Sequence, residues 1–139
     1  MEKKTRLKRI ILIISVVLIV VAGVVIVAKT ALNKMESNLE RLVQLDVMDV
    51  DLELISDGTY TGEYSAVPVS AKVDVTIKDH RIESIELLEH NHGQGDGAEV
   101  IPSIVVEKQT LQIDSVSGAT YSSKVILKAI ENALQNSID

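Results

Sequence analysis

Three patterns of apolar and polar positions divide the chain, and the first is an apolar run over residues 10–28. In these 19 residues only Ser15 and Gly23 are not strongly apolar. A helix of this length spans about 28 Å, enough to cross the hydrocarbon core of a membrane. A core helix of a small domain would not be apolar on every side, and a cleavable signal peptide has a shorter apolar segment. We therefore expect a membrane-spanning anchor.

The second pattern covers residues 29–49, where apolar residues recur at alternating steps of three and four. The apolar stripe comprises Leu32, Met35, Leu39 and Leu42, and Asp46 and Asp49 take the next two stripe positions. Two interpretations remain open for this predicted stalk. It forms a short dimerising coil, or it is a single amphipathic helix on the surface of the membrane or the domain. We favour the single helix because only two heptads are present.

The third pattern is an alternation with a period of two, which predicts antiparallel strands from residue 50 onward. The predicted strands cover residues 50–54, 60–66, 69–77 and 82–87. The last of them changes phase, which predicts a bulge near Ser84. Residues 78–81 are expected to form a hairpin connection between the third and fourth strands.

Two predicted helices complete the domain. Residues 100–109 have helical apolar spacing with Pro102 in the first turn, where proline is tolerated. After Thr120 the apolar positions of one buried face recur at Val125, Ile126, Ala129, Ile130, Ala133 and Leu134. Ser122 or Ser123 is expected to cap this second helix. The predicted fold class is α+β, a small antiparallel sheet packed with two helices and preceded by one transmembrane helix.

The charges around the apolar run set the expected orientation. Five basic residues precede it, Lys3, Lys4, Arg6, Lys8 and Arg9. Only Lys29 and Lys34 follow closely, so the positive-inside rule places the N-terminus in the cytoplasm. The expected organisation is a cytoplasmic segment 1–9, an anchor 10–28, a stalk 29–49 and an extracytoplasmic domain 50–139, in a cell membrane protein that crosses once.

Composition excludes several classes of function. Residues 30–139 hold 8 basic and 19 acidic residues, a formal charge of −11. Such a domain is a poor nucleic-acid binder, because phosphates need a basic patch. The chain contains no Cys, which excludes disulfides, a lipid-anchored cysteine, thiolate iron–sulfur ligation and cysteine-based zinc sites.

The most informative motif lies directly before the last helix. It reads Asp114-Ser115-Val116-Ser117-Gly118-Ala119-Thr120. A flexible turn and a hydroxyl thus lie beside the free amide groups and positive dipole of a helix start, which suits a phosphate. Lys124 and Lys128 lie near the same end, where the dipole disfavours cations. A bound anion would offset that cost.

At these residues the chain resembles the FMN-binding domain family, whose members include the C subunit of the sodium-translocating NADH:quinone reductase and the G subunit of the Rnf complex. The family motif is Asp-x-x-Ser/Thr-Gly-Ala-Thr, and residues 114–120 match it at every position. The resemblance covers roughly residues 57–134, including Asp57-Gly58-Thr59-Tyr60-Thr61-Gly62. It implies that Thr120 carries FMN as a phosphoester, installed by a separate flavin transferase that uses FAD and a divalent metal.

The remaining site residues surround Thr120 in the sequence. The expected cofactor-binding residues are Asp114, Ser117, Gly118, Ala119, Thr120, Tyr121 and Lys124, with no catalytic residue and no metal ligand. Asp114 shapes the loop as an Asx turn, or it is recognised or contacts a metal during flavinylation. Without Trp or Phe and with three Tyr, the chain offers few rings for stacking a free flavin. A covalent tether removes the need for such stacking.

A polar segment, 90–97, stands where larger family members carry a Thr-Pro-Gly loop near the flavin. Here the sequence is His90-Asn91-His92-Gly93, so contacts from this loop to the flavin are in question, although its glycines let the backbone approach closely. His90 and His92 lie beside Asp96 and Glu99, which is a conceivable metal set. Because a third firm ligand is lacking, we expect a solvated loop instead.

The resemblance implies a membrane-anchored flavoprotein that relays electrons at the outer face, an electron-transfer component rather than a stand-alone enzyme. Its expected partners are the flavin transferase, membrane or cell-surface redox partners and the lipid bilayer. The alternative is a flavin-free, membrane-tethered binding or sensor module in which the Ser-Gly-Ala-Thr loop only caps a helix.

Overall fold

The computed structural model describes the backbone of residues 2–138 and the side chains of residues 6–138. The chain divides into two compact units, Met1–Glu36 and Ser37–Asp139. Helix α1 (Glu2–Val43) supplies the first unit and the beginning of the second.

The first unit is an apolar helix without a core of its own. Between Ile10 and Val27 its large apolar side chains are 47–71% exposed, and none of its most apolar window is buried. A continuous apolar surface of this size is stable only in an apolar medium. Within the described residues, α1 is the one helix long and apolar enough to cross a membrane, which is consistent with single-pass anchoring.

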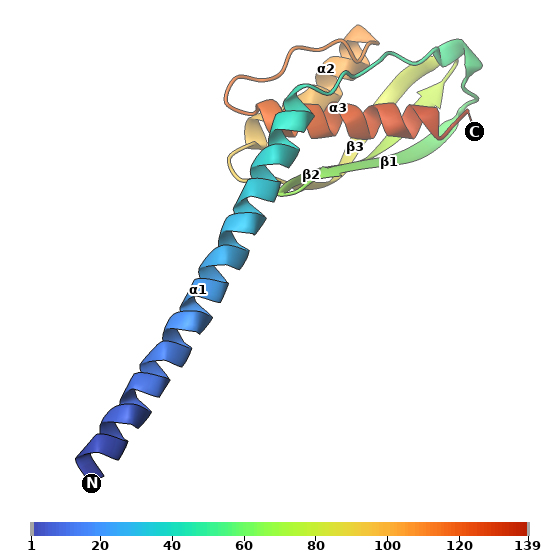
Figure 1. Ribbon diagram of the computed structural model, residues 1–139. Coiled ribbons are helices and arrows are strands. Elements are labelled where there is room, and N and C mark those ends of the chain that lie inside the picture. Colours follow the sequence, from blue (N-terminus) through green and yellow to red (C-terminus); the bar gives the residue numbers. More distant parts are fainter. Residues whose placement is uncertain (1, 139) are drawn as a thin grey trace. The chain divides into compact units, whose positions relative to one another are not determined.

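The second unit is built on a three-stranded antiparallel sheet in the order β1 (Gly58–Ala66), β2 (Val69–Lys78) and β3 (Arg81–Asn91), labelled in Figure 1. Asp79 and His80 connect β2 to β3 with φ values of 49° and 58°, the left-handed pair that a type I′ hairpin requires. The register shifts between Thr76↔Ser84 and Ile77↔Ile82, so Glu83 lies outside the pairing. The predicted hairpin and the bulge near Ser84 are confirmed.

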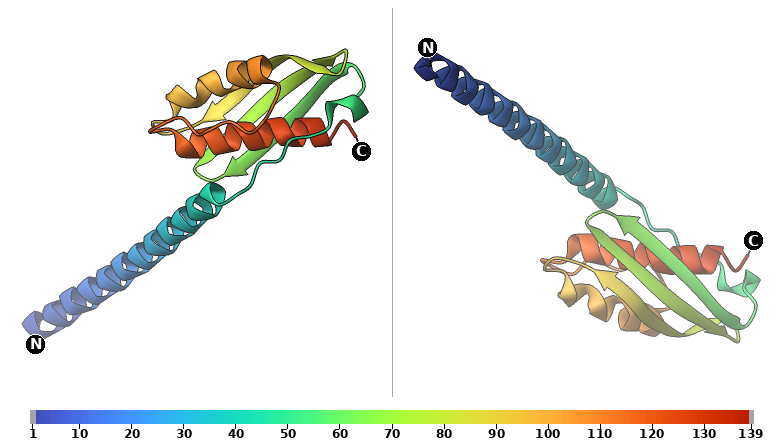
Figure 2. Two further views of the ribbon diagram at one scale, coloured as in Figure 1. Left: turned by 90° about the horizontal axis from the view of Figure 1, so that it is seen from above. Right: turned by 90° about the horizontal axis from the view of Figure 1, so that it is seen from below.

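Helices α2 (Ile101–Lys108) and α3 (Thr120–Gln135) cover one face of this sheet, as Figure 2 shows, and no helix of the described part of the second unit covers the other face. The predicted apolar face of α3 is fully buried, each of its six residues being at most 1% exposed. Gly62 brings β1 so close to α3 that a Cβ there would lie 2.1 Å from the carbonyl oxygen of Ala129. The α+β fold class is confirmed.

The strand predicted over residues 50–54 is wrong. This segment contains a short 3-10 helix, η1 (Leu52–Leu54), in which the Asp51 carboxylate accepts the N–H of Glu53 at 3.0 Å. Upstream, the Asp49 carboxylate accepts the Thr110 hydroxyl at 2.7 Å. The Asp51 side chain thus satisfies a backbone donor two residues away, and alternation alone does not reveal that competition with strand pairing.

The apolar stripe of the predicted stalk packs on its own domain from Ser37 onward. Leu42 is 1% exposed, and Leu39 packs against the same core. Neither residue is therefore available to a dimerising coil, which agrees with the single helix. After Val43 the chain continues without regular structure to Asp51.

Candidate functional site

The motif forms a tight turn that leads into α3. Ala119 donates its N–H to the carbonyl of Val116 at 2.9 Å, and Gly118 has a φ of 79° at the third position of this turn. A positive φ there defines a type II turn, which favours glycine. A Cβ at Gly118 would meet nothing within 4 Å, so the backbone angle and not the available space demands glycine.

Ser123 locks this turn onto the helix. Its hydroxyl accepts the N–H of Val116 at 3.0 Å and donates to the carbonyl of Ala119 at 2.9 Å. The prediction that Ser122 or Ser123 caps the helix is wrong, because α3 begins earlier, at Thr120, and its N-cap Ala119 makes no side-chain bond. Ser122 and Ser123 are buried inside the first turn.

The start of α3 presents Thr120 with unused backbone donors. Thr120 is exposed at the first helical position, whereas the neighbouring Ala119 is buried. Within the described residues, the N–H groups of Thr120, Tyr121 and Ser122 have no hydrogen-bond acceptor. Three free donors at the positive end of a 16-residue helix favour an anion next to the Thr120 hydroxyl.

A cavity of about 240 Å³ opens beside this hydroxyl. Its lining comes from four parts of the second unit: Leu39, Pro68, Val69, Gly93, Gln94, Gly95, Gly118, Ala119, Thr120, Tyr121 and Ser122. The volume is below that of most pockets that enclose a whole ligand. It suits one end of an aromatic ring system, with the rest of the ligand at the surface.

The other predicted site residues have different surroundings. Ser117 is exposed in the turn, and Tyr121 is 42% exposed at the cavity. Asp114 is also exposed, and within the described residues its carboxylate makes no hydrogen bond or ion pair. An Asx turn at Asp114 is therefore absent from this part of the structure, and the carboxylate is free to meet an external group.

Lys124 and Lys128 both have partners within the domain. The Lys124 ammonium donates to the carbonyl of Leu45 at 2.9 Å, and that of Lys128 lies 2.7 Å from a carboxylate oxygen of Glu131. Glu131 is fully buried, so Lys128 neutralises a charge that would otherwise be costly. A bound phosphate is therefore not needed to offset either lysine.

The histidine segment is folded against the domain and not solvated as expected. His90 lies in β3 with its side chain 3% exposed, and its Nδ1 is 3.1 Å from Glu99 Oε1. His92 is 24% exposed, and its Nε2 is 3.8 Å from the same oxygen. His92 Nδ1 accepts the N–H of Gly95 at 3.2 Å, which occupies the lone pair and leaves the proton of the neutral ring on Nε2. The three side chains thus fit a hydrogen-bonded cluster better than a metal set.

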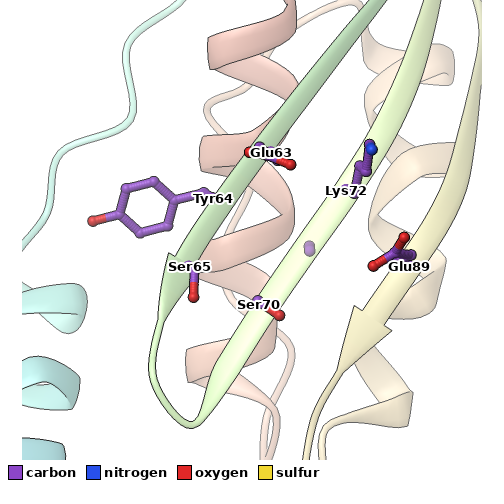
Figure 3. A pocket seen from close by; sticks show the side chains of 7 residues that line it. Glu63, Tyr64, Ser65, Ser70, Lys72 and Glu89 are labelled. Carbon is purple, nitrogen blue, oxygen red and sulfur yellow. The ribbon is translucent and has the colours of Figure 1, made fainter.

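A second hollow lies on the open face of the sheet and contains no residue of the motif. Figure 3 shows Lys72 between Glu63 and Glu89, its register partners on the two neighbouring strands. The volume of this hollow is about 340 Å³, and charged and hydroxyl side chains supply most of its lining. Polar and apolar surface line this hollow in similar amounts, whereas the lining of the cavity at Thr120 is mostly apolar.

Comparison with known families agrees with this geometry. Residues 69–135 match the model of the FMN-binding domain family. These residues belong to the FMN-binding domain family. No curated relative matches the chain.

The FMN-binding domain takes in β2, β3, α2 and α3, and so includes the turn, the histidine segment and most of the cavity lining. This match supports FMN as its cofactor. Sequence reasoning missed Leu39 and the Pro68–Val69 turn as cavity residues, since nothing local signals their approach to Thr120. One sign for Leu39 was available in the sequence: its position in the apolar stripe predicted that it is buried. That position did not predict which surface buries it.

Proposed function

We propose that FMN is attached to Thr120 through its phosphate and that the domain carries electrons at the outer face of a membrane. The observation that supports this most directly is the exposed Thr120 hydroxyl at a helix start with three unused N–H donors, beside the cavity. In the proposed maturation, the Thr120 oxygen forms a bond to the phosphorus of the FMN half of FAD. The phosphoanhydride bond breaks, AMP leaves and the hydroxyl proton is released.

The chain's own residues would hold and orient the group. The free N–H groups of α3 stabilise the phosphoester charge, and Gly118 and Ala119 shape the turn around it. Tyr121 and the cavity lining shield part of the ring from water. Bound FMN supplies one- and two-electron chemistry, while the protein sets its position and electrostatic surroundings. The unpartnered Asp114 carboxylate is available to the flavin transferase or to the divalent metal of that enzyme.

Co-production with a flavin transferase tests this function. We expect the full chain to gain one FMN by intact mass and to remain fluorescent after denaturing electrophoresis, because a phosphoester survives unfolding. Production without the transferase is the matched control and should give an unmodified chain. If no flavin is retained with the transferase present, the chain acts as a flavin-free binding or sensor module instead.

The proposed location of the domain outside the cytoplasm has a separate test. Because the chain contains no Cys, an introduced cysteine supplies its one thiol. Leu7→Cys places a thiol before the apolar run and keeps all five basic residues, whereas Ser65→Cys places one at an exposed position of β1. A membrane-impermeant maleimide added to intact cells should label Ser65→Cys and should label Leu7→Cys only after permeabilisation. The reverse pattern would place the domain in the cytoplasm.

A further inference from the structure

The backbone of residues 93–95 forms one wall of the cavity at Thr120, and a single side chain holds this segment. Gly93, Gln94 and Gly95 all line the cavity. His92 Nδ1 accepts the N–H of Gly95 at 3.2 Å, which closes a small loop over the two residues between them. The carbonyl of Gly95 also accepts the N–H of Ala98 at 3.0 Å, so the His92 imidazole is the side-chain part of what positions this wall.

The segment 93–95 also packs directly against α3, the helix that begins with Thr120. A Cβ at Gly95 would lie 1.9 Å from the hydroxyl oxygen of Ser122 and 2.7 Å from its Cβ. Contact this close leaves little room for the loop to move toward α3. Its available movement is outward, away from the helix, and the bond from Gly95 to His92 opposes that movement.

Two further groups orient His92. Its ring centroid lies 4.3 Å from that of His90, and its Nε2 faces Glu99 Oε1 at 3.8 Å. His90 Nδ1 donates to the same carboxylate oxygen at 3.1 Å. Because the Gly95 N–H needs the Nδ1 lone pair, the neutral ring carries its proton on Nε2, directed toward Glu99. Glu99 thus favours the tautomer that can hold the loop.

We propose that His92 is a positioning residue for the flavin: it fixes the 93–95 backbone as a wall of the FMN pocket. The inference rests on the proposed attachment at Thr120. A flavin tethered there reaches the cavity, and backbone dipoles beside the ring tune its reduction potential and its access to water. Removal of the Nδ1 acceptor loosens this wall without touching the attachment point.

The test compares two substitutions in the full chain in detergent. His92→Leu has similar bulk and no acceptor, whereas His92→Asn offers a side-chain oxygen near the Nδ1 position. We expect His92→Leu to speed hydrogen exchange of the Gly95 amide roughly tenfold in the flavin-free protein, as the loss of one hydrogen bond predicts. In the flavinylated protein it should shift the FMN midpoint potential and raise quenching of FMN fluorescence by iodide. His92→Asn should restore the exchange rate, the midpoint potential and the quenching toward wild type.

Unchanged Gly95 exchange in His92→Leu would overturn the proposal, as would faster exchange with an unchanged potential and unchanged quenching. Should His92→Leu fail to fold, Glu99→Ala frees the same imidazole and should move the exchange rate, the midpoint potential and the quenching in the same direction by less. A wild-type chain that gains no FMN mass would refute the proposed function and the flavin role together. The Gly95 exchange would still show whether His92 holds the loop, so the two failures are distinguishable.

Discussion

Thr120→Val, co-produced with a flavin transferase, is expected to carry no FMN at all. Valine has the same branched shape as threonine and lacks only the hydroxyl that would form the phosphoester. Thr120 is exposed at the first position of α3, so the substitution disturbs no buried contact. The measurement is intact mass together with in-gel flavin fluorescence after denaturation, and the expected loss is complete rather than partial.

Two further variants test whether the Thr120 hydroxyl itself, and not another feature of the turn, is required for attachment. Thr120→Ser keeps a hydroxyl at the same position and is expected to retain FMN. Ser117→Ala removes the exposed hydroxyl of the preceding turn, an expected binding residue, and tests whether Ser117 is the attachment point instead. If the Thr120→Val chain still gains the mass of FMN, the attachment site lies elsewhere, and loss of the adduct in Ser117→Ala alone would point to Ser117.

Gly62→Ala is expected to cause a large loss of stability. A Cβ at this position would lie 2.1 Å from the Ala129 carbonyl oxygen and 2.3 Å from the Ala133 nitrogen. Both are backbone atoms of a helix, which cannot rotate away as a side chain can. Sheet and helix must separate, at a cost of about 3 kcal/mol. For a domain of this size that lowers the melting temperature by roughly 15 °C.

Gly93→Ala is the matched control, because a Cβ there meets nothing within 4 Å. Scanning calorimetry of the full chain in detergent should show a large downward shift for Gly62→Ala and little change for Gly93→Ala. Equal melting temperatures for the two variants would mean that α3 does not press on β1 as closely as the structure shows. Since α3 begins with Thr120, Gly62→Ala should also reduce flavinylation.

The alternation in β2 and the apolar stripe of α3 predicted those elements correctly, because each element buries one face along its whole length. The strand prediction over residues 50–54 failed for a local reason. Asp51 closes a turn with Glu53, and a carboxylate that accepts a backbone N–H competes with strand pairing in a way that hydrophobic periodicity does not reveal. The cap prediction failed similarly, since the Ser123 hydroxyl accepts a bond from the preceding turn instead of capping the start of the helix.

The apolar helix, the α+β class and the motif at residues 114–120 are predictable from the amino-acid order alone, because each depends on a repeating period or on a short contiguous pattern. The surroundings of Thr120, in contrast, become visible only in the folded chain. Leu39, near the end of α1, lines the cavity beside Thr120, and Gly95 packs against Ser122. The Lys124 ammonium donates to the carbonyl of Leu45, 79 residues away in the chain. Contacts of this kind depend on how the elements pack, and packing joins residues whose separation along the chain carries no periodic signal.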